Sequence, residues 1–301
     1  MGTFFKQIYR YTRPRRYRHN ENLWPYVRIT RANEGHIESL RFRGHPVPIV
    51  NLSSLKDKYS GDLLVVASGP SVNEIDFTPL KKLPAMGVNG SWYLRDKTSF
   101  NLFMIVDMTF IDQRPNMVNE VISDQNIMFF TTVNCLVKII KQFGLSALRC
   151  QIAIIEDACY KIFKPQILPD EIHQHYQHEK DISFSEADKN IAFSHDIRKG
   201  VFDAATVAYW ALQVIHFMGF NRLMIAGLDM NNFQRPRFYE NEHDISPSFL
   251  EDKFTGLIEP AFSHASKVFK EKNIEVLNLS LQSRLDSSVF KKVSSNDIQQ
   301  K

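Results

Sequence analysis

The chain has 301 residues, of which 44% are hydrophobic, 12% aromatic and 23% charged. That length suffices for one large domain or two small ones, and the composition excludes a disordered, collagen-like or multi-span membrane protein. The 37 basic residues exceed the 33 acidic ones by only four, so the position of the basic residues is more informative than their number.

Residues 1–25 form a basic and aromatic arm. Six basic residues and no acid lie within the first 18 positions, interleaved with aromatic residues such as Phe4 and Tyr11. Such a patch is typical of contact with anionic lipid headgroups, and we expect residues 1–18 to bind an anionic membrane surface. Nucleic acid and a solvated arm without a partner are the alternatives; we expect no nucleic acid, because no basic track continues downstream. The six cations are Lys6, Arg10, Arg13, Arg15, Arg16 and Arg18.

No signal peptide or membrane-spanning segment is predicted. The apolar stretch that would follow a charged start is broken by Arg10, Arg13 and Pro14, so we expect the chain in the cytoplasm. The longest apolar segment, residues 201–220, is interrupted by polar residues and predicts a buried helix.

A run of apolar segments in the middle of the chain predicts the main domain. Residues 26–60 predict a small β hairpin that precedes it, and residues 286–301 a polar tail. The domain itself, residues 61–285, opens with an apolar run at 62–67 that is typical of a strand covered on both faces. Further strands are expected at 85–89, 102–107, 127–130, 151–155, 221–229 and 274–279, with helices at 73–80, 200–220 and 247–272.

Polar residues appear repeatedly where these apolar strands end. Examples are Asn89, Asp107, Thr131 and Asp229. In an open, mostly parallel sheet the carboxyl ends of the strands border the ligand crevice, although each such residue taken singly is also an ordinary turn residue. The pattern therefore predicts a Rossmann-like, doubly wound α/β domain with its site along that edge.

Residues 165–195 lose periodicity and predict a long loop that covers the site like a lid. The segment contains His175 and His178, but two histidines are too few for a metal site, and solvated surface histidines are the favoured interpretation. The three cysteines, Cys135, Cys150 and Cys159, lack metal-ligand spacing and are expected to be reduced and buried.

The first strand runs into the turn Ser-Gly-Pro-Ser at 68–71, which fits a phosphate. Gly69 allows close backbone approach, and the amide groups and the positive end of the following helix favour an anion. The turn is not G-x-G-x-x-G and no Gly-Lys-Ser/Thr follows, which disfavours a nicotinamide dinucleotide fold and a Walker loop.

The order of the motifs resembles two related families. In order they are Ser-Gly-Pro-Ser at 68–71, Val-Asn-Gly-Ser at 88–91, Val-Asp at 106–107, Gly-Val-Phe at 200–202, Ala-Gly-Leu-Asp-Met at 226–230, Arg-Phe-Tyr-Glu at 237–240, Asn-Leu-Ser at 278–280 and Arg-Leu at 284–285. This order resembles the bacterial lipopolysaccharide-core transferases that add a third 3-deoxy-D-manno-octulosonic acid (Kdo) and, more distantly, the bacterial sialyltransferases that use CMP-sialic acid. The resemblance implies a GT-A-like fold of the sialyltransferase type.

The resemblance also implies the donor, a CMP-activated 2-keto sugar acid, and the residues that bind it. The turn after the first strand would lie near the phosphate, and Asn89 and Asp107 near the cytidine and ribose. Arg198 and Lys199 stand where the sialyltransferases have Thr-Ser, so they either face the sugar carboxylate or merely solvate a loop. The expected donor-binding residues are Ser68, Gly69, Pro70, Ser71, Asn89, Ser91, Asp107, Thr131, Thr132, Arg198, Lys199, Gly200 and Ser280.

Transfer to an acceptor hydroxyl needs a general base and stabilisation of the leaving phosphate. His243 is the candidate base, because it lies in the segment where the sialyltransferases carry a catalytic histidine. Asp229 is the competing base or a structural cap, and Tyr239 is a candidate hydrogen-bond donor to the phosphate. No D-x-D motif is present, so we expect no metal and no cofactor.

The sequence thus predicts a glycosyltransferase that moves Kdo from CMP-Kdo to a lipid-linked surface glycan, peripheral on the cytoplasmic face of the inner membrane. Transfer of sialic acid or another CMP-sugar acid, a pterin-type pyrophosphokinase and a non-catalytic nucleotide-binding module stay open as alternatives. The acceptor sugar and the linkage depend on pocket shape, which the sequence does not define.

Overall fold

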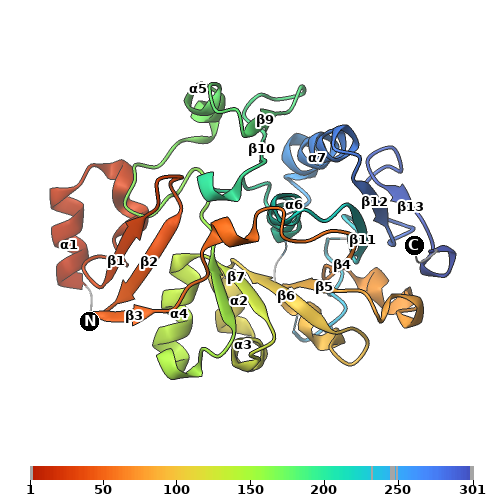
Figure 1. Ribbon diagram of the computed structural model, residues 1–301, viewed down its shortest axis with the longest axis horizontal. Coiled ribbons are helices and arrows are strands. Elements are labelled where there is room, and N and C mark those ends of the chain that lie inside the picture. Colours follow the sequence, from red (N-terminus) through yellow and green to blue (C-terminus); the bar gives the residue numbers. More distant parts are fainter. Residues whose placement is uncertain (1–2, 232, 245–247, 249, 299–301) are drawn as a thin grey trace.

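The computed structural model describes residues 3–231, 233–244, 248 and 250–298. Its centre is an eight-stranded sheet in the order β13-β12-β11-β4-β5-β6-β7-β8, in which every neighbouring pair is parallel (Figure 1). This confirms the predicted parallel α/β sheet. The strands are β4 (Asp62–Val66), β5 (Ala85–Val88), β6 (Phe100–Ile105), β7 (Met128–Thr131), β8 (Gln151–Ile154), β11 (Arg222–Ala226), β12 (Glu275–Asn278) and β13 (Lys291–Lys292).

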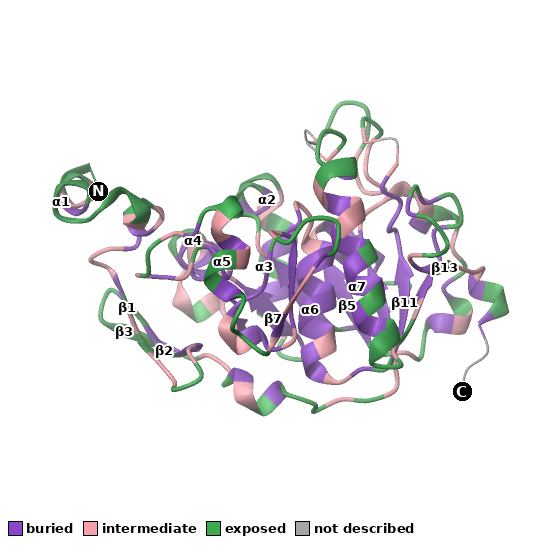
Figure 2. Ribbon diagram, turned by 90° about the horizontal axis from the view of Figure 1, so that it is seen from above, coloured by how far each residue is buried: buried purple, intermediate pink, exposed green. Residues whose placement is uncertain are grey.

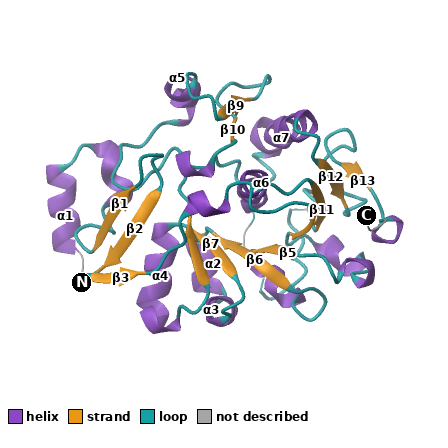
Figure 3. Cartoon of the chain, in the orientation of Figure 1, coloured by secondary structure: helices purple, strands orange, loops and turns teal. Residues whose placement is uncertain are grey.

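Helices cover both faces of the sheet, which explains the continuous apolar runs of its strands. Successive side chains of a strand point to opposite faces, so Leu63 and Val65 join one core and Leu64 and Val66 the other. The first core is closed by α6 (Val207–Met218) and α7 (Glu259–Glu271). The second core is closed by α2 (Met108–Gln113), α3 (Pro115–Ser123) and α4 (Val133–Phe143), as Figure 3 shows. The three cysteines are buried, as expected.

The N-terminal part is more ordered than the predicted arm and hairpin. It consists of α1 (Thr3–Thr12), a 3₁₀ turn, and a three-stranded antiparallel sheet of β1 (Val27–Arg31), β2 (Ile37–Phe42) and β3 (His45–Val47), instead of two strands. The helix is docked because Tyr9 is buried and because Glu21 forms ion pairs with Lys6 and Arg10. Arg16 pairs with Glu171, so three of the six cations of the arm are engaged.

Other segments differ from their predictions at identifiable points. The expected loop at 165–195 contains α5 (Ile172–Tyr176) and a hairpin of β9 (Ile182–Phe184) and β10 (Ala192–Ser194). The long helix predicted from residue 200 begins only at Val207, because the Thr206 side chain caps it by accepting from the Ala208 amide. The helix predicted over 247–272 is a π turn (Phe254–Ile258) followed by α7, and Pro247 lies outside the described residues.

The predicted polar tail also contributes structure. It provides β13 and buries Phe290. Among the described residues, no helix has both the length and the apolar character that crossing a membrane requires.

A chain of hydrogen-bonded histidines attaches the β9–β10 hairpin to the helical layer. His195 Nδ1 lies 3.1 Å from His216 Nε2 on α6, and Ser183 Oγ lies 3.0 Å from both His195 Nε2 and His264 Nε2 on α7. The pKa of His216 falls to about 4, chiefly because burial disfavours the charged imidazolium. Burial also lowers the pKa values of His195 and His264. These three histidines are therefore neutral at pH 7.

We expect these hydrogen-bonded histidines to make the stability of the protein sensitive to acid. An unfolded histidine has a pKa of about 6.5, so between pH 6.5 and 4 the unfolded state binds a proton that folded His216 does not. The free energy of unfolding should therefore fall as the pH drops through this range, by roughly 3 kcal/mol from His216 alone. Urea denaturation at pH 7.5 and pH 4.5 measures this loss.

The matched variants for this measurement are His216→Gln, which cannot titrate, and His178→Gln, which removes an exposed histidine. The His216→Gln protein should lose less stability between the two pH values than the wild type, whereas His178→Gln should behave like the wild type. An identical pH dependence in all three proteins would contradict the assignment.

Candidate functional site

A pocket opens at the carboxyl edge of the sheet, at the point where the chain direction across the sheet reverses. After β4 the chain moves to β5 on one side, and after β11 it moves to β12 on the other, although β4 and β11 are neighbours (Figure 3). Such a switch point is the usual ligand crevice of an open α/β sheet. The pocket is lined by the turns at 67–70 and 227–231, by 206–208 at the start of α6, by Val88, and by Phe233, Arg235, Arg237, Ser248 and Leu250.

The two turns are joined by the carboxylate of Asp229. Its Oδ2 accepts a 2.9 Å hydrogen bond from the Ser71 amide, and its Oδ1 accepts a short one from the Ser71 hydroxyl. The Ser71 hydroxyl also lies 2.7 Å from Ser280 Oγ after β12. Ser71 and Ser280 therefore lie behind the residues that line the pocket, and Ser71 already donates its amide to a carboxylate within the chain.

Gly69 is required by the contact between these turns. A Cβ atom at position 69 would lie 2.5 Å from the Asp229 carboxyl carbon and 2.6 Å from the Gly227 carbonyl oxygen. Gly227 has a φ of +74°, and a Cβ there would lie 2.9 Å from the Ala67 carbonyl oxygen. The sequence expectation that Gly69 allows a ligand to approach needs correction, because the close neighbour is the protein itself.

Positive charge reaches the pocket from α6 and from the segment after β11. The first residues of α6 line the pocket, so the positive end of a 12-residue helix faces it. Arg235 is exposed, and Arg237 forms a 2.7 Å ion pair with buried Glu240. A helix N-terminus with two guanidinium groups is an environment that favours anionic ligands.

The predicted donor-binding residues at the carboxyl ends of strands β5 and β7 are largely buried. Asn89 follows Val88, has a φ of +47° and holds its Oδ1 buried without a hydrogen-bond partner. Ser91 is fully buried, and its hydroxyl lies beneath the turn beside Gly87, so it does not face the pocket. Thr131 is also buried and donates to the Ile105 carbonyl at 2.8 Å. Neither side chain lines the pocket, because a residue's place in a turn does not determine where its side chain points.

Asp107 and Thr132 serve as helix caps. Asp107 accepts from the Thr109 amide at the start of α2, and Thr132 accepts from the Cys135 amide at the start of α4. Both lie at the carboxyl edge of the sheet, but neither lines the pocket.

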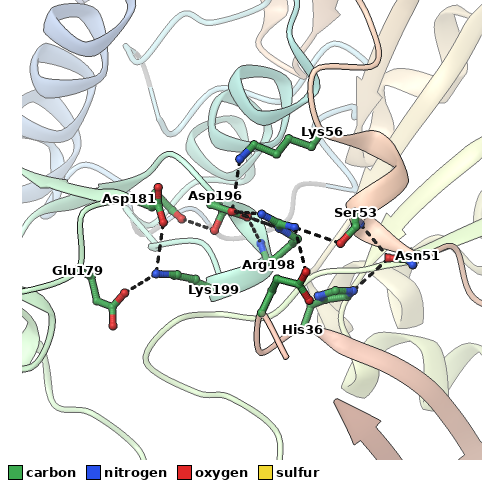
Figure 4. Close-up of polar contacts among 11 residues, drawn as sticks. His36, Asn51, Ser53, Lys56, Glu179, Asp181, Asp196, Arg198 and Lys199 are labelled. Atoms are coloured by element: carbon green, nitrogen blue, oxygen red, sulfur yellow. Dashed lines mark hydrogen bonds and ion pairs between the residues drawn. The ribbon is translucent and has the colours of Figure 1, made fainter. Parts of the chain in front are cut away.

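Arg198 and Lys199 lie in a separate ion-pair network, drawn in Figure 4. Arg198 binds both oxygens of Asp196 and donates to Ser53 Oγ at 3.1 Å. Lys199 pairs with Glu179 and, at 3.3 Å, with Asp181. Neither lines the pocket, and these contacts favour the interpretation in which the two cations stabilise a loop.

Gly200, which follows them, has a φ of +96° and would bring a Cβ within 2.9 Å of Ala158 Cα. This glycine is required for backbone packing.

Of the three catalytic candidates, only Asp229 lines the pocket. Asp229 lines the pocket, but both its oxygens accept hydrogen bonds from Ser71. His243 is exposed, lies outside the pocket lining, and its amide donates to Asn241 Oδ1 at 2.9 Å. Tyr239 packs between Gly90 and Tyr93. Burial raises the pKa of Tyr239, so its hydroxyl keeps its proton at neutral pH.

Two parts of the site were missed at the level of sequence. Thr206 before an apolar run is a helix-start signal that would have located the α6 N-terminus. Arg235 belongs to none of the motifs that predicted the site, whereas the predicted lid at 165–195 contributes no lining residue. Within the described part of the chain, no three His, Cys, Asp or Glu side chains gather where they could hold a metal ion.

Comparison with known proteins relates most of the chain to one family. Residues 49–295 match the sequence model of the family described as 3-deoxy-D-manno-octulosonic acid transferase WaaZ. The probable 3-deoxy-manno-octulosonic acid transferase of Escherichia coli (strain K12) is 24% identical over 262 residues, which cover 81% of this chain and 86% of that protein. Its counterpart in Salmonella typhimurium (strain LT2) is 23% identical over 252 residues, covering 76% and 84%.

Among solved structures, the sialyltransferase CstII from Campylobacter jejuni, in complex with a substrate analogue, cytidine-5'-monophosphate, is similar with a TM-score of 0.44. The two sequences are 11% identical, and the match covers 78% of this chain and 85% of that one. A complex of the same enzyme with a trisaccharide acceptor and CMP gives a TM-score of 0.40 at 9% identity, covering 79% and 88%.

We expect Asp229→Ala to destabilise the protein by about 2 kcal/mol, because the Ser71 amide and hydroxyl would lose a charged acceptor in a buried position. Ser71→Ala should cost less, because the carboxylate keeps the Ser71 amide. Urea denaturation measures both. The control is Asp107→Ala, which removes the exposed N-cap of α2. An Asp229→Ala protein as stable as the wild type would contradict the structural role of Asp229.

Proposed function

This chain belongs to the family of 3-deoxy-D-manno-octulosonic acid transferases, which are glycosyltransferases, and we propose that its donor is the CMP-activated form of that sugar acid. The acceptor we propose is a glycan of the lipopolysaccharide type. Transfer forms a glycosidic bond between the anomeric carbon of the sugar acid and an acceptor hydroxyl, and releases CMP.

The observation that carries this proposal is the distribution of positive charge around the switch-point pocket. A CMP-activated sugar acid has two anionic groups, the phosphodiester and the carboxylate. The pocket is lined by the first residues of α6 and by Arg235 and Arg237, of which Arg237 is paired with Glu240. Two sources of positive charge facing one pocket suit a ligand with two anions.

The same arrangement supports departure of the phosphate. Negative charge grows on the CMP oxygen as the glycosidic bond to it breaks, and fixed positive dipoles or cations stabilise that charge. We propose His243 as the base that takes the proton from the acceptor hydroxyl, because both oxygens of Asp229 are committed to Ser71. We further propose that the reaction uses neither metal nor cofactor, in line with the missing D-x-D motif in the sequence.

We expect CMP to raise the melting temperature, since a ligand selective for the folded state stabilises it, and expect NADH or ATP with magnesium not to. Arg235→Ala should weaken CMP binding about tenfold by removing one charge-assisted contact. His243→Ala should leave CMP binding unchanged and lower turnover about a hundredfold. Thermal shift, calorimetry and product analysis with CMP-Kdo and CMP-sialic acid measure these effects.

Lys82→Ala, at the amino end of β5 and outside the pocket lining, is the charge-matched control for Arg235→Ala. Stabilisation by ATP with magnesium but not by CMP would overturn the proposal in favour of a pyrophosphokinase. A response to none of the nucleotides would favour a non-catalytic protein. Turnover of CMP-sialic acid but not CMP-Kdo would keep the reaction class and change the donor.

We also propose that the enzyme attaches peripherally to the cytoplasmic face of the inner membrane through α1, where a lipid-linked acceptor would lie. Phe4 and Tyr11 are 68% and 90% exposed on one side of this helix. Arg13, Arg15 and Arg18 are exposed, and none has an ion pair with an acid in the described residues. In Figure 2, α1 lies on the same side of the molecule as α2, which follows the carboxyl end of β6 and so marks the carboxyl edge of the sheet.

Replacing Arg13, Arg15 and Arg18 together by Ala should release the protein from anionic vesicles at low salt, since each cation near such a surface contributes about 1 kcal/mol. Co-sedimentation with vesicles measures this. The control variant replaces Lys58, Lys81 and Lys82 by Ala. It removes the same charge at the opposite edge of the sheet and should have little effect on vesicle binding. Equal release by both triple variants would place the contact elsewhere or make it non-specific.

A further inference from the structure

Arg114 holds the segment after β11 against the α2–α3 corner. Its side chain is only 14% exposed, and its Nη1 forms a 2.7 Å ion pair with Asp244 Oδ2. Its guanidinium carbon lies 5.6 Å from the centre of the Tyr239 ring, which is a cation–π distance. One side chain from the sheet domain thus contacts two residues of the segment that bears the pocket arginines.

The Tyr239 ring fits in its place only because residue 90 is glycine. A Cβ atom at position 90 would lie 2.0 Å from Tyr239 Cε1. The ring also stacks on Tyr93, with centroids 5.6 Å apart and an interplanar angle of 21°, and meets the edge of Phe110 at 6.4 Å. The ring position is therefore defined from three sides, and Arg114 contacts it as well.

This anchored turn is continuous with the pocket wall. Arg237, which lines the pocket, precedes Tyr239 by two residues. Glu240 accepts from the Arg237 amide at 2.9 Å and from its Nη1 at 2.7 Å. The Phe238 amide donates to the carbonyl of Ser68, another pocket residue, at 3.4 Å. A shift of Tyr239 would therefore change the position of the Arg237 guanidinium relative to the pocket.

Arg114 is not fully satisfied by these contacts. Its second terminal nitrogen, Nη2, is buried without a hydrogen-bond partner in the described structure. A buried unpaired donor costs free energy, and a residue kept only for stability is normally fully bonded. Asn89 Oδ1, at the turn on which Tyr239 packs, is likewise buried and unpaired.

We propose that Arg114 is a positioning residue for donor binding. Through Tyr239 and Asp244 it holds the 237–240 turn in the place from which Arg237 faces the pocket. The inference rests on the proposed function, since it takes the ligand of that pocket to be the anionic donor.

The test compares three variants for CMP binding and for turnover. Arg114→Ala removes both contacts, and Gly90→Ala displaces the Tyr239 ring without touching a pocket residue. Arg95→Ala is the matched control, because Arg95 also lies over an aromatic ring, Trp92 at 6.0 Å, and pairs with an acid, Glu120 at 3.3 Å, but has no contact of this kind with the 237–244 segment.

We expect Arg114→Ala and Gly90→Ala to raise the Kd for CMP and the donor KM about tenfold or more, since small misplacements of a binding group are costly. The Kd for CMP is the readout that isolates this role, because Arg114 also pairs with Asp244, the neighbour of the proposed base His243, so the kcat at saturating donor should fall as well. Arg114→Lys keeps the charge for Asp244 but loses the guanidinium over the Tyr239 ring, and should lie between Arg114→Ala and the wild type. Wild-type affinity for CMP in folded Arg114→Ala would overturn the inference.

Hydrogen exchange without ligand separates this inference from the proposed function. The amides of Phe238 and Glu240 should exchange faster in Arg114→Ala and Gly90→Ala than in the wild type or Arg95→Ala. Unchanged exchange in both variants would overturn the anchoring. If the wild type does not bind CMP, the proposed function fails and the positioning role toward that donor fails with it, whereas faster exchange would still show that Arg114 anchors the segment.

Discussion

The two hydrogen bonds that Asp229 accepts from Ser71 are the contact on which the site depends. The chain leaves the neighbouring parallel strands β4 and β11 toward opposite sides of the sheet, so the turns that follow them would separate. The carboxylate of Asp229 joins the two turns at that point. The approach is so close that residues 69 and 227 are both glycine. The pocket is the space that remains beyond this junction, where the α6 N-terminus and the segment after β11 meet.

Apolar packing holds the centre of the molecule, and ion pairs hold its peripheral parts. Apolar layers on both faces hold the sheet, and its central strands are also joined by ion pairs of Arg222 with Asp62 and Glu275. Other charged pairs attach the peripheral parts. Arg31 on β1 binds Glu156 after β8 at 2.5 Å, and Arg198 binds Asp196 beside the N-terminal sheet. Arg235 and Arg15 have no ion pair among the described residues, and the proposed function assigns them to the anionic ligand and the anionic surface.

This distinction between paired and unpaired cations changes the interpretation of the basic arm. Counting charge treats its six cations alike, but Glu21 engages Lys6 and Arg10, and Glu171 engages Arg16. These pairs orient α1 so that Phe4 and Tyr11 face outward. A docked amphipathic helix presents its exposed residues in one fixed direction, which a flexible arm does not.

The sequence by itself determined the parallel sheet, because strands buried on both faces must be continuously apolar and must end in turns that carry polar residues. For the same reason it located the turns at 68–71 and 226–230 that line the site. Only the tertiary structure decided which side chains face the pocket. Ser91 and Thr131 turn into the core, Arg198 pairs with Asp196 outside the pocket lining, and Arg114 reaches Tyr239 across 125 positions of the chain. Side-chain direction in a turn, and contact between distant segments, depend on packing in three dimensions, and local sequence patterns carry no record of either.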